Sequence, residues 1–133
     1  MKVIFAGGGT GGHLYPAVAI SEQLKKNNIN YYFMVSDRGI ERNILRPLNC
    51  QFEEQKVSAY MNQSVTGKIK ALFNMIKATG RALKVVQKGD KVILTGGFAA
   101  APSAIAAVLK GCDLYLHEQN SVMGLVTVSY THL

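Results

Sequence analysis

Short apolar runs alternate along this chain with stretches whose apolar residues recur at helical spacing. Runs rich in β-branched and aromatic residues predict strands at Lys2–Ala6, Tyr31–Val35, Gln51–Val57, Lys91–Leu94 and Leu114–His117. Helical spacing predicts helices at Ile40–Leu45, at Lys68–Gln87 and from Pro102 to Lys110, and another with Pro16 in its first turn that ends near Lys26. This alternation predicts an α/β fold, with an open parallel sheet, helices on both faces and right-handed crossovers.

Two glycine-rich segments follow predicted strands. The first glycine loop, Gly7–His13, follows the first strand, and the second glycine loop, Thr95–Phe98, follows the fourth. Glycine lets a backbone turn sharply and pass close to a ligand, and the helix that follows offers free N–H groups to an anion. Both loops fall at the carboxyl edge of a parallel sheet, where ligands bind. The pair therefore predicts a site for a phosphate-bearing substrate.

Polar residues at the same predicted edge are candidates for the chemistry. His117, Glu118, Gln119 and Asn120 end the fifth strand, where they are poor core material and suit a sugar or phosphate site. Glu118 could be a base or accept from a hydroxyl, and Asn120 could satisfy a donor and an acceptor on a ligand. The alternative is a polar loop that caps a following helix. His13 is either a base, since histidines ordinarily titrate near neutral pH, or a hydrogen-bond donor to a phosphate or sugar, or a packing residue.

The first glycine loop also satisfies the dinucleotide-binding pattern G-x-G-x-x-G. Asp37, near the end of the second predicted strand, would then hydrogen-bond a ribose, so an NAD-binding oxidoreductase domain is an alternative. A nucleotide P-loop is excluded, because His13 stands where that motif requires lysine. A tight turn that packs a strand against a helix would also explain the glycines.

Composition limits the class of protein. With 133 residues, a hydrophobic fraction of 48% and a charged fraction of 17%, the chain is expected to form one globular domain. Cys50 and Cys112 follow no metal or redox spacing and are expected to be buried thiols in a reducing compartment. No run is long enough to span a bilayer and the start does not resemble a signal peptide, so we expect a cytoplasmic protein. The net charge of +7 favours an anionic partner, but no nucleic-acid-binding signature accompanies it, and no nucleic acid is expected.

Much of the positive charge lies in one amphipathic segment, Lys68–Lys88. A basic helix of this kind either packs its apolar face on the sheet and solvates its charges, or lies on an anionic membrane. We expect packing for most of the helix and membrane contact for its first half, Lys68–Lys77. The residues expected to touch lipid are Lys68, Ile69, Lys70, Leu72, Phe73 and Ile76.

Three motifs, taken together, resemble those of one family. Gly7–His13 followed by Tyr15-Pro16, then Thr95–Phe98, then His117–Ser121 are similar, in this order, to the motifs of the bacterial MurG family. The resemblance extends from Met1 to about Val126 and implies a Rossmann-like N-terminal domain of a GT-B glycosyltransferase. These inverting enzymes transfer N-acetylglucosamine from UDP-N-acetylglucosamine to undecaprenyl-diphosphate-muramoyl-pentapeptide (lipid I), which gives lipid II for peptidoglycan.

The resemblance also implies roles for individual residues. The glycine loops would face the lipid-linked diphosphate, His13 and Glu118 would be catalytic, and the anionic inner leaflet would be a partner at the cytoplasmic face of the cell membrane. The implied substrate-binding residues are Thr10, Gly11, Gly12, His13, Gly96, Gly97 and Asn120. We expect neither a metal nor a cofactor, because no DxD-type carboxylate pair ends a predicted strand.

The chain departs from the family pattern in three places. Ala100 and Ala101 precede Pro102 where the family usually has serine and glycine, and Phe98 stands where it often has tyrosine. Residues 127–133 do not resemble the expected next helix. We therefore expect an incomplete acceptor-side domain at 1–126, an atypical tail at 127–133, no C-terminal donor-binding domain, and no transferase activity from this fragment alone. A peripheral membrane interaction module is a further alternative.

Overall fold

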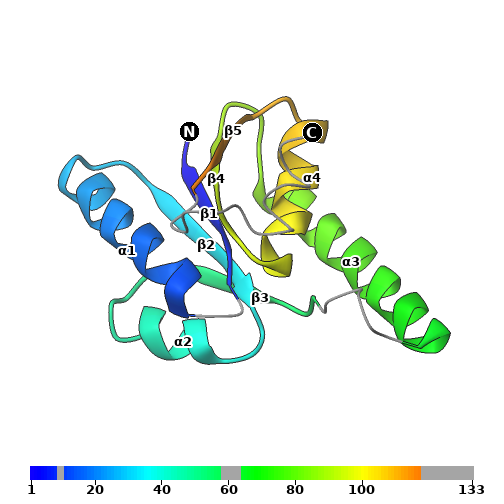
Figure 1. Cartoon of the computed structure of the whole chain (residues 1–133). Helices are drawn as coiled ribbons and strands as arrows, with labels where there is room; N and C mark the ends of the chain where they lie inside the picture. The colour runs from blue at the N-terminus through cyan, green and yellow to red at the C-terminus, as the bar shows by residue number, and fades with distance from the viewer. Residues whose placement is uncertain (9–10, 58–63, 118–133) are drawn as a thin grey trace.

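The computed structural model describes residues 1–8, 11–57 and 64–117, which form a single sheet flanked by helices (Figure 1). The strands are β1 (Val3–Gly7), β2 (Tyr31–Ser36), β3 (Phe52–Gln55), β4 (Lys91–Gly96) and β5 (Asp113–Leu116). The helices are α1 (Gly11–Lys26), α2 (Ile40–Leu45), α3 (Val65–Val85) and α4 (Ala101–Leu109), with a 3-10 turn, η1, at Phe98–Ala100.

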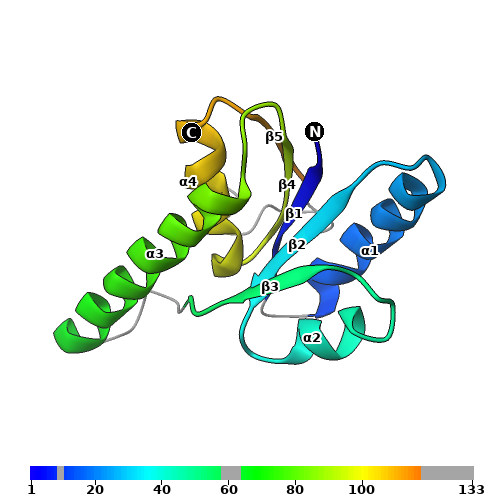
Figure 2. The same ribbon diagram turned by 180° about the vertical axis from the view of Figure 1, so that it is seen from behind.

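The sheet has the strand order β3-β2-β1-β4-β5, and every neighbouring pair is parallel. Phe5 of β1 lies opposite Phe33 of β2 on one side and Ile93 of β4 on the other. Helices α1 and α2 cover one face, and α3 and α4 cover the other (Figures 1 and 2). The predicted fold class is confirmed, and the parallel order brings the ends of β1 and β4 together at the centre of the carboxyl edge.

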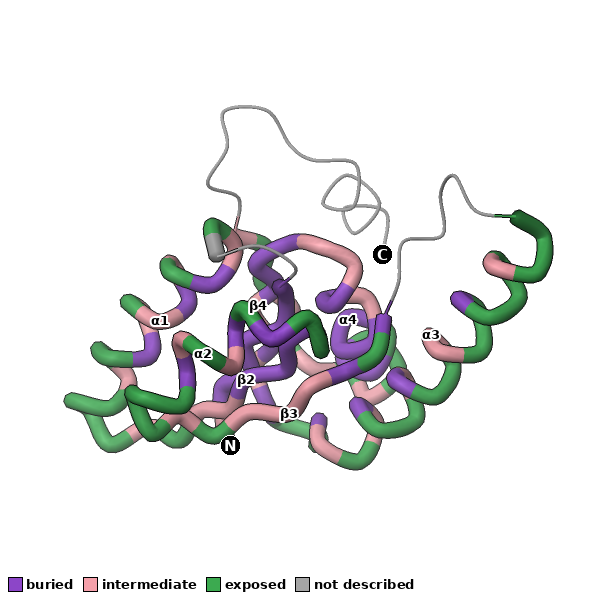
Figure 3. The backbone as a smooth tube through the Cα atoms, turned by 90° about the horizontal axis from the view of Figure 1, so that it is seen from below, coloured by how far each residue is buried: buried purple, intermediate pink, exposed green. Residues whose placement is uncertain are grey.

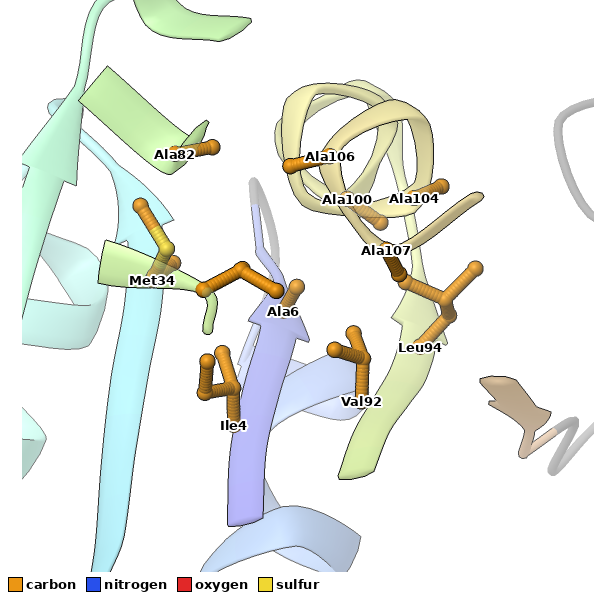
Figure 4. Close-up of a cluster of buried hydrophobic side chains, with 11 residues drawn as sticks. Ile4, Ala6, Met34, Ala82, Val92, Leu94, Ala100, Ala104, Ala106 and Ala107 are labelled. Carbon is orange, nitrogen blue, oxygen red and sulfur yellow. The ribbon is translucent and has the colours of Figure 1, made fainter. Parts of the chain in front are cut away.

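Two buried clusters, one on each face of the sheet, form the core. On the α3/α4 face, Ile4, Met34 and Leu94 pack beneath helical alanines that include Ala82 and Ala104 (Figure 4). On the α1/α2 face, the rings of Phe5 and Phe33 stack with their centroids 5.1 Å apart, against Leu14, Ala17 and Leu45. Alanines allow close approach of α4 to the sheet, because their side chains add little volume between backbone and strand.

Helix α1 begins earlier than the sequence predicts. It starts at Gly11, so Pro16 lies inside the helix and not in its first turn. Proline is disfavoured inside a helix, because it lacks the N–H and restricts the residue before it, and it is tolerated in the first turn. The sequence therefore predicts that the helix starts just before Pro16. Helix α3 also begins earlier, at Val65, because the Ser64 side chain caps it by accepting a hydrogen bond from the Gly67 N–H at 3.2 Å.

Helix α3 packs through small residues and leaves its large ones outside. Ala71, Ala78 and Ala82 are buried, whereas Phe73 and Ile76 are 64% and 60% exposed. The first half of α3 projects past the sheet (Figures 1 and 2), and its outer side is exposed (Figure 3). The large apolar residues predicted to contact lipid in this half therefore lie on the exposed side of the helix, and the lipid contact itself stays a prediction. The two cysteines are half-buried, not buried as expected.

Candidate functional site

The two glycine loops touch each other at the carboxyl edge of the sheet. The Gly8 N–H donates to the Gly96 carbonyl oxygen at 3.3 Å. Gly96 and Gly97 have φ angles of +103° and +81°, which residues with side chains rarely adopt. A Cβ on Gly97 would overlap the Gly8 carbonyl oxygen, and a Cβ on Gly7 would overlap the Thr95 hydroxyl. Contact between the loops is thus sufficient to explain these glycines.

His13 connects the first turn of α1 to the second glycine loop. Its Nδ1 atom lies 3.0 Å from the Thr95 carbonyl oxygen. Since a carbonyl only accepts hydrogen bonds, Nδ1 carries the proton in the neutral ring, and the lone pair lies on Nε2. The ring also lies against Gly96, where an added Cβ would be 3.0 Å from Nδ1. The half-buried imidazole is held in the tautomer that a base acting through Nε2 requires.

Two helix starts face this edge. Helix α1 begins at Gly11, four residues after β1 ends, and η1 followed by α4 begins at Phe98, two residues after β4 ends. The first turns of α1 and α4 contain no acidic residue. The positive ends of the helix dipoles would favour an anion at such a place. The described part of the predicted site therefore suits a phosphate group.

The structure brings together some of the predicted site residues. Gly12 and His13 lie in the first turn of α1, and Gly96 of the second glycine loop lies against the His13 ring, next to Gly97 in the chain. The His117 N–H donates to the Leu94 carbonyl oxygen at 2.8 Å, which holds the end of β5 against β4. Thr10, Glu118 and Asn120 lie outside the described residues.

Sequence reasoning assigned no role to Glu41, yet this residue is completely buried at the same edge. Its Oε2 atom accepts a hydrogen bond from the Ser36 hydroxyl at 3.1 Å. Its Oε1 atom occupies the space that a Cβ on Gly8 would need. The only signal in the sequence is its spacing of four residues from Leu45, which places both on the inner side of α2.

The exposed side of α3 forms an apolar surface bordered by positive charge. Its large side chains, from 53% to 76% exposed, are Val65, Ile69, Leu72, Phe73 and Ile76. Two hollows of about 330 and 120 Å³ lie along α3 and share Lys56 and Asn74. The other cationic side chains that line them are Arg38, Lys70, Lys77 and Arg81. Within the described ranges, no helix is long and apolar enough to cross a membrane.

Other features of the described chain lie away from the glycine loops. A hollow of about 780 Å³ lies at the amino edge of the sheet and is lined by residues that include Lys2, Tyr31 and Asp90. It is an open depression, and none of the predicted site residues lines it. The described residues contain no cluster of His, Cys, Asp or Glu that could hold a metal ion.

Comparison with known proteins identifies the family. The model of the glycosyltransferase family 28 N-terminal domain matches residues 3–131. UDP-N-acetylglucosamine–N-acetylmuramyl-(pentapeptide) pyrophosphoryl-undecaprenol N-acetylglucosamine transferase of Syntrophotalea carbinolica is 36% identical, over 94% of this chain and 36% of that protein. The protein of the same name from Halothermothrix orenii is 39% identical, over 94% of this chain and 34% of that protein.

A solved structure gives the same result. The crystal structure of Acinetobacter baumannii MurG matches with a TM-score of 0.79 and 26% identity, over 99% of this chain and 39% of that chain. The chain thus spans about a third of the length of the curated relatives it matches. The MurG-like motifs, the parallel sheet and the family match over residues 3–131 together show that this chain belongs to the glycosyltransferase family 28 N-terminal domain family.

Proposed function

We propose that this chain forms the acceptor-side domain of an enzyme that transfers N-acetylglucosamine from UDP-N-acetylglucosamine to lipid I, which yields lipid II. The curated relatives are named for this transfer to an N-acetylmuramyl-(pentapeptide) pyrophosphoryl-undecaprenol. The observation that carries the proposal is the junction of the two glycine loops, where the Thr95 carbonyl orients His13. This junction lies at the carboxyl edge, where parallel sheets bind ligands.

In the proposed mechanism, the loops bind the acceptor and His13 activates it. Backbone N–H groups at the starts of α1 and α4 hold the acceptor diphosphate. Nε2 of His13 removes the proton of the acceptor hydroxyl as its oxygen attacks the anomeric carbon of the donor sugar. The bond from that carbon to the diphosphate of UDP breaks in the same displacement, which inverts the anomeric centre. We assign Thr10 and Asn120 to donor contacts across the cleft and Glu118 to a catalytic polar role.

We further propose a division of labour between domains. Residues 1–126 would supply the acceptor wall of the cleft, and the donor wall would come from a domain that the relatives possess beyond the matched region. Transfer requires that both reactants be held in line, and one wall alone loses the positioning contribution to the rate. Residues 1–133 by themselves should therefore show no transfer and little nucleotide affinity.

We also propose that the enzyme attaches to the cytoplasmic face of the cell membrane through α3. The exposed surface of Ile69, Leu72, Phe73 and Ile76 would enter the headgroup region, and Lys68 and Lys70 would attract anionic lipids. A lipid-linked acceptor lies in the membrane, so this attachment would bring the glycine loops to their substrate.

The proposal is tested in a protein that contains this chain followed by a second α/β domain of the kind found in its relatives. Transfer is measured from UDP-N-acetylglucosamine to a lipid I analogue, with His13→Ala and Glu118→Ala as variants. Loss of a general base should lower turnover by about 100-fold or more. An effect of His13→Ala confined to the donor KM would make His13 a binding residue. Turnover within a few-fold of the parent for both variants would defeat the catalytic assignment.

A further inference from the structure

We propose that Glu41 is a positioning residue, which fixes the two glycine loops and, through them, the imidazole of His13. Glu41 is the second residue of α2 and is fully buried. A buried carboxylate is costly unless hydrogen bonds compensate it, and an apolar residue would serve packing alone better. The contacts of this side chain should therefore show which role, other than packing, explains its burial.

The carboxylate of Glu41 lies where three segments meet. Oε2 accepts from the Ser36 hydroxyl at the end of β2, at 3.1 Å. Oε1 lies in the place of the missing side chain of Gly8, whose φ angle is +137°. The backbone nitrogen of Ser36 is 3.1 Å from that same place. The position of Gly8 is thus set by the Glu41 carboxylate on one side.

The opposite side of Gly8 faces the second glycine loop. Its N–H donates to the Gly96 carbonyl, and its own carbonyl oxygen fills the space beside Gly97. Gly96 in turn backs the ring of His13, whose Nδ1 is fixed by Thr95. A continuous series of contacts therefore leads from Glu41 through Gly8 to His13. Cores are close-packed and transmit displacement, so movement of the carboxylate should move the ring.

The first experiment follows His13 directly and does not depend on the proposed function. NMR of the 133-residue chain reports the ring nitrogens of His13 and the amides of Gly8, Gly96 and Gly97 in the parent, in Glu41→Gln and in Ser36→Ala. Glu22→Gln, on the exposed side of α1, is the matched control. We expect the parent ring to be protonated on Nδ1, and both test variants to shift or broaden these signals while the control leaves them unchanged.

The second experiment rests on the proposed function and uses the longer, active protein. Misplacement of a catalytic group should lower kcat by about 10- to 100-fold in Glu41→Gln. Ser36→Ala, which keeps the Glu41 side chain, should show a smaller loss of kcat in the same direction, and Glu22→Gln should match the parent. Because Glu41 touches no substrate in this scheme, KM for the nucleotide sugar should change less than kcat.

The outcomes distinguish the positioning role of Glu41 from the proposed transferase function. If the variants lose thermal stability but leave the His13 and glycine signals unchanged, Glu41 only stabilises the fold and the proposal is overturned. Unchanged signals in a folded Ser36→Ala overturn it as well when Glu41→Gln does not fold. If the NMR signals shift as expected but the longer parent protein transfers no sugar, the proposed function fails and the positioning role stands.

Discussion

The carbonyl oxygen of Gly8 occupies the space that a side chain on Gly97 would need. Gly97 is therefore required for the two loops to pack against each other, whether or not a ligand binds. A substitution at Gly97 should separate the two loops, and its effects on stability and on substrate binding should appear together.

Gly97→Ala should lower the free energy of unfolding by about 3 kcal/mol, from its positive φ angle and the backbone overlap together. Gly89→Ala is a matched control, since Gly89 also has a positive φ of +94° but no described atom lies within 4 Å of its added Cβ. In that control the free energy of unfolding should fall by only about 1 kcal/mol. Chemical denaturation of both variants measures the difference, and equal losses would show that the loops can separate without strain.

Gly80→Ala should stabilise the protein. Gly80 lies within α3, and no described atom comes within 4 Å of an added Cβ. Alanine in an exposed helix interior is more favourable than glycine by about 0.5–1 kcal/mol, because it restricts the unfolded chain. The midpoint of urea unfolding should rise accordingly. Gly111→Ala is the control and should lower this midpoint, because Gly111 has a φ of +65°. A lower midpoint for Gly80→Ala would mean that α3 is not helical at this position.

Replacement of both Ile69 and Phe73 by serine should reduce binding to anionic vesicles by about 10-fold or more, because their apolar surface no longer enters the headgroup region. The control carries serine at Val108 and Leu109, which are 47% and 68% exposed on α4. Co-sedimentation measures both, and equal losses would remove α3 as the contact surface.

The basic side chains should act through a separate, salt-dependent term. Loss of Lys68 and Lys70 together should weaken binding by about 30-fold at low salt, at about 1 kcal/mol per lysine, and less at high salt. Equal binding of the parent to neutral and anionic vesicles, or binding to neither, would contradict a membrane role for the charges.

Asp90 should make the free energy of unfolding depend on pH in the acidic range. Burial raises the pKa of its carboxyl, but hydrogen bonds from the Lys2 side chain and backbone and from the Gln87 N–H outweigh it, so the net pKa is below its ordinary value. The stabilisation is present at neutral pH and is lost as pH falls through the folded-state pKa, which lies below the ordinary value of an aspartate carboxyl. Asp90→Asn should lose about 1–3 kcal/mol at pH 7 and converge with the parent in acid. A difference that does not shrink with acid would contradict this account.

Most of the fold follows from local pattern. The three central strands, β1, β2 and β4, are mostly apolar runs between turn residues, and the predicted span Ile40–Leu45 is the helix observed. Their alternation leaves few topologies, and the observed parallel order is one of them. Pro16 misled the prediction for α1, because an internal proline and a first-turn proline read alike in sequence.

Features that depend on tertiary contacts could not be predicted from the sequence. Helix α3 has two apolar sides, one of alanines and one of large residues, and periodicity does not say which side faces the sheet. Glu41 could not be predicted as a buried residue for the same reason. In sequence it resembles a surface glutamate, and only the fold places Ser36 and Gly8 around it. The glycine loops and His13 could be predicted because each glycine-rich run directly follows a predicted strand, which is a local pattern in the sequence.

The hydrogen bonds between Lys2 and Asp90 join β1 to β4 at their amino ends, with Nζ to Oδ2 at 2.7 Å and the Lys2 N–H to Oδ1 at 3.0 Å. The glycine loops leave the opposite ends of the same two strands, and six residues of β4 span about 20 Å. Free-energy changes at such separations are usually additive. A destabilising change in the glycine loops can therefore be offset by a stabilising change near Lys2. The two ends of one pair of strands can thus be altered independently while the folded population is kept.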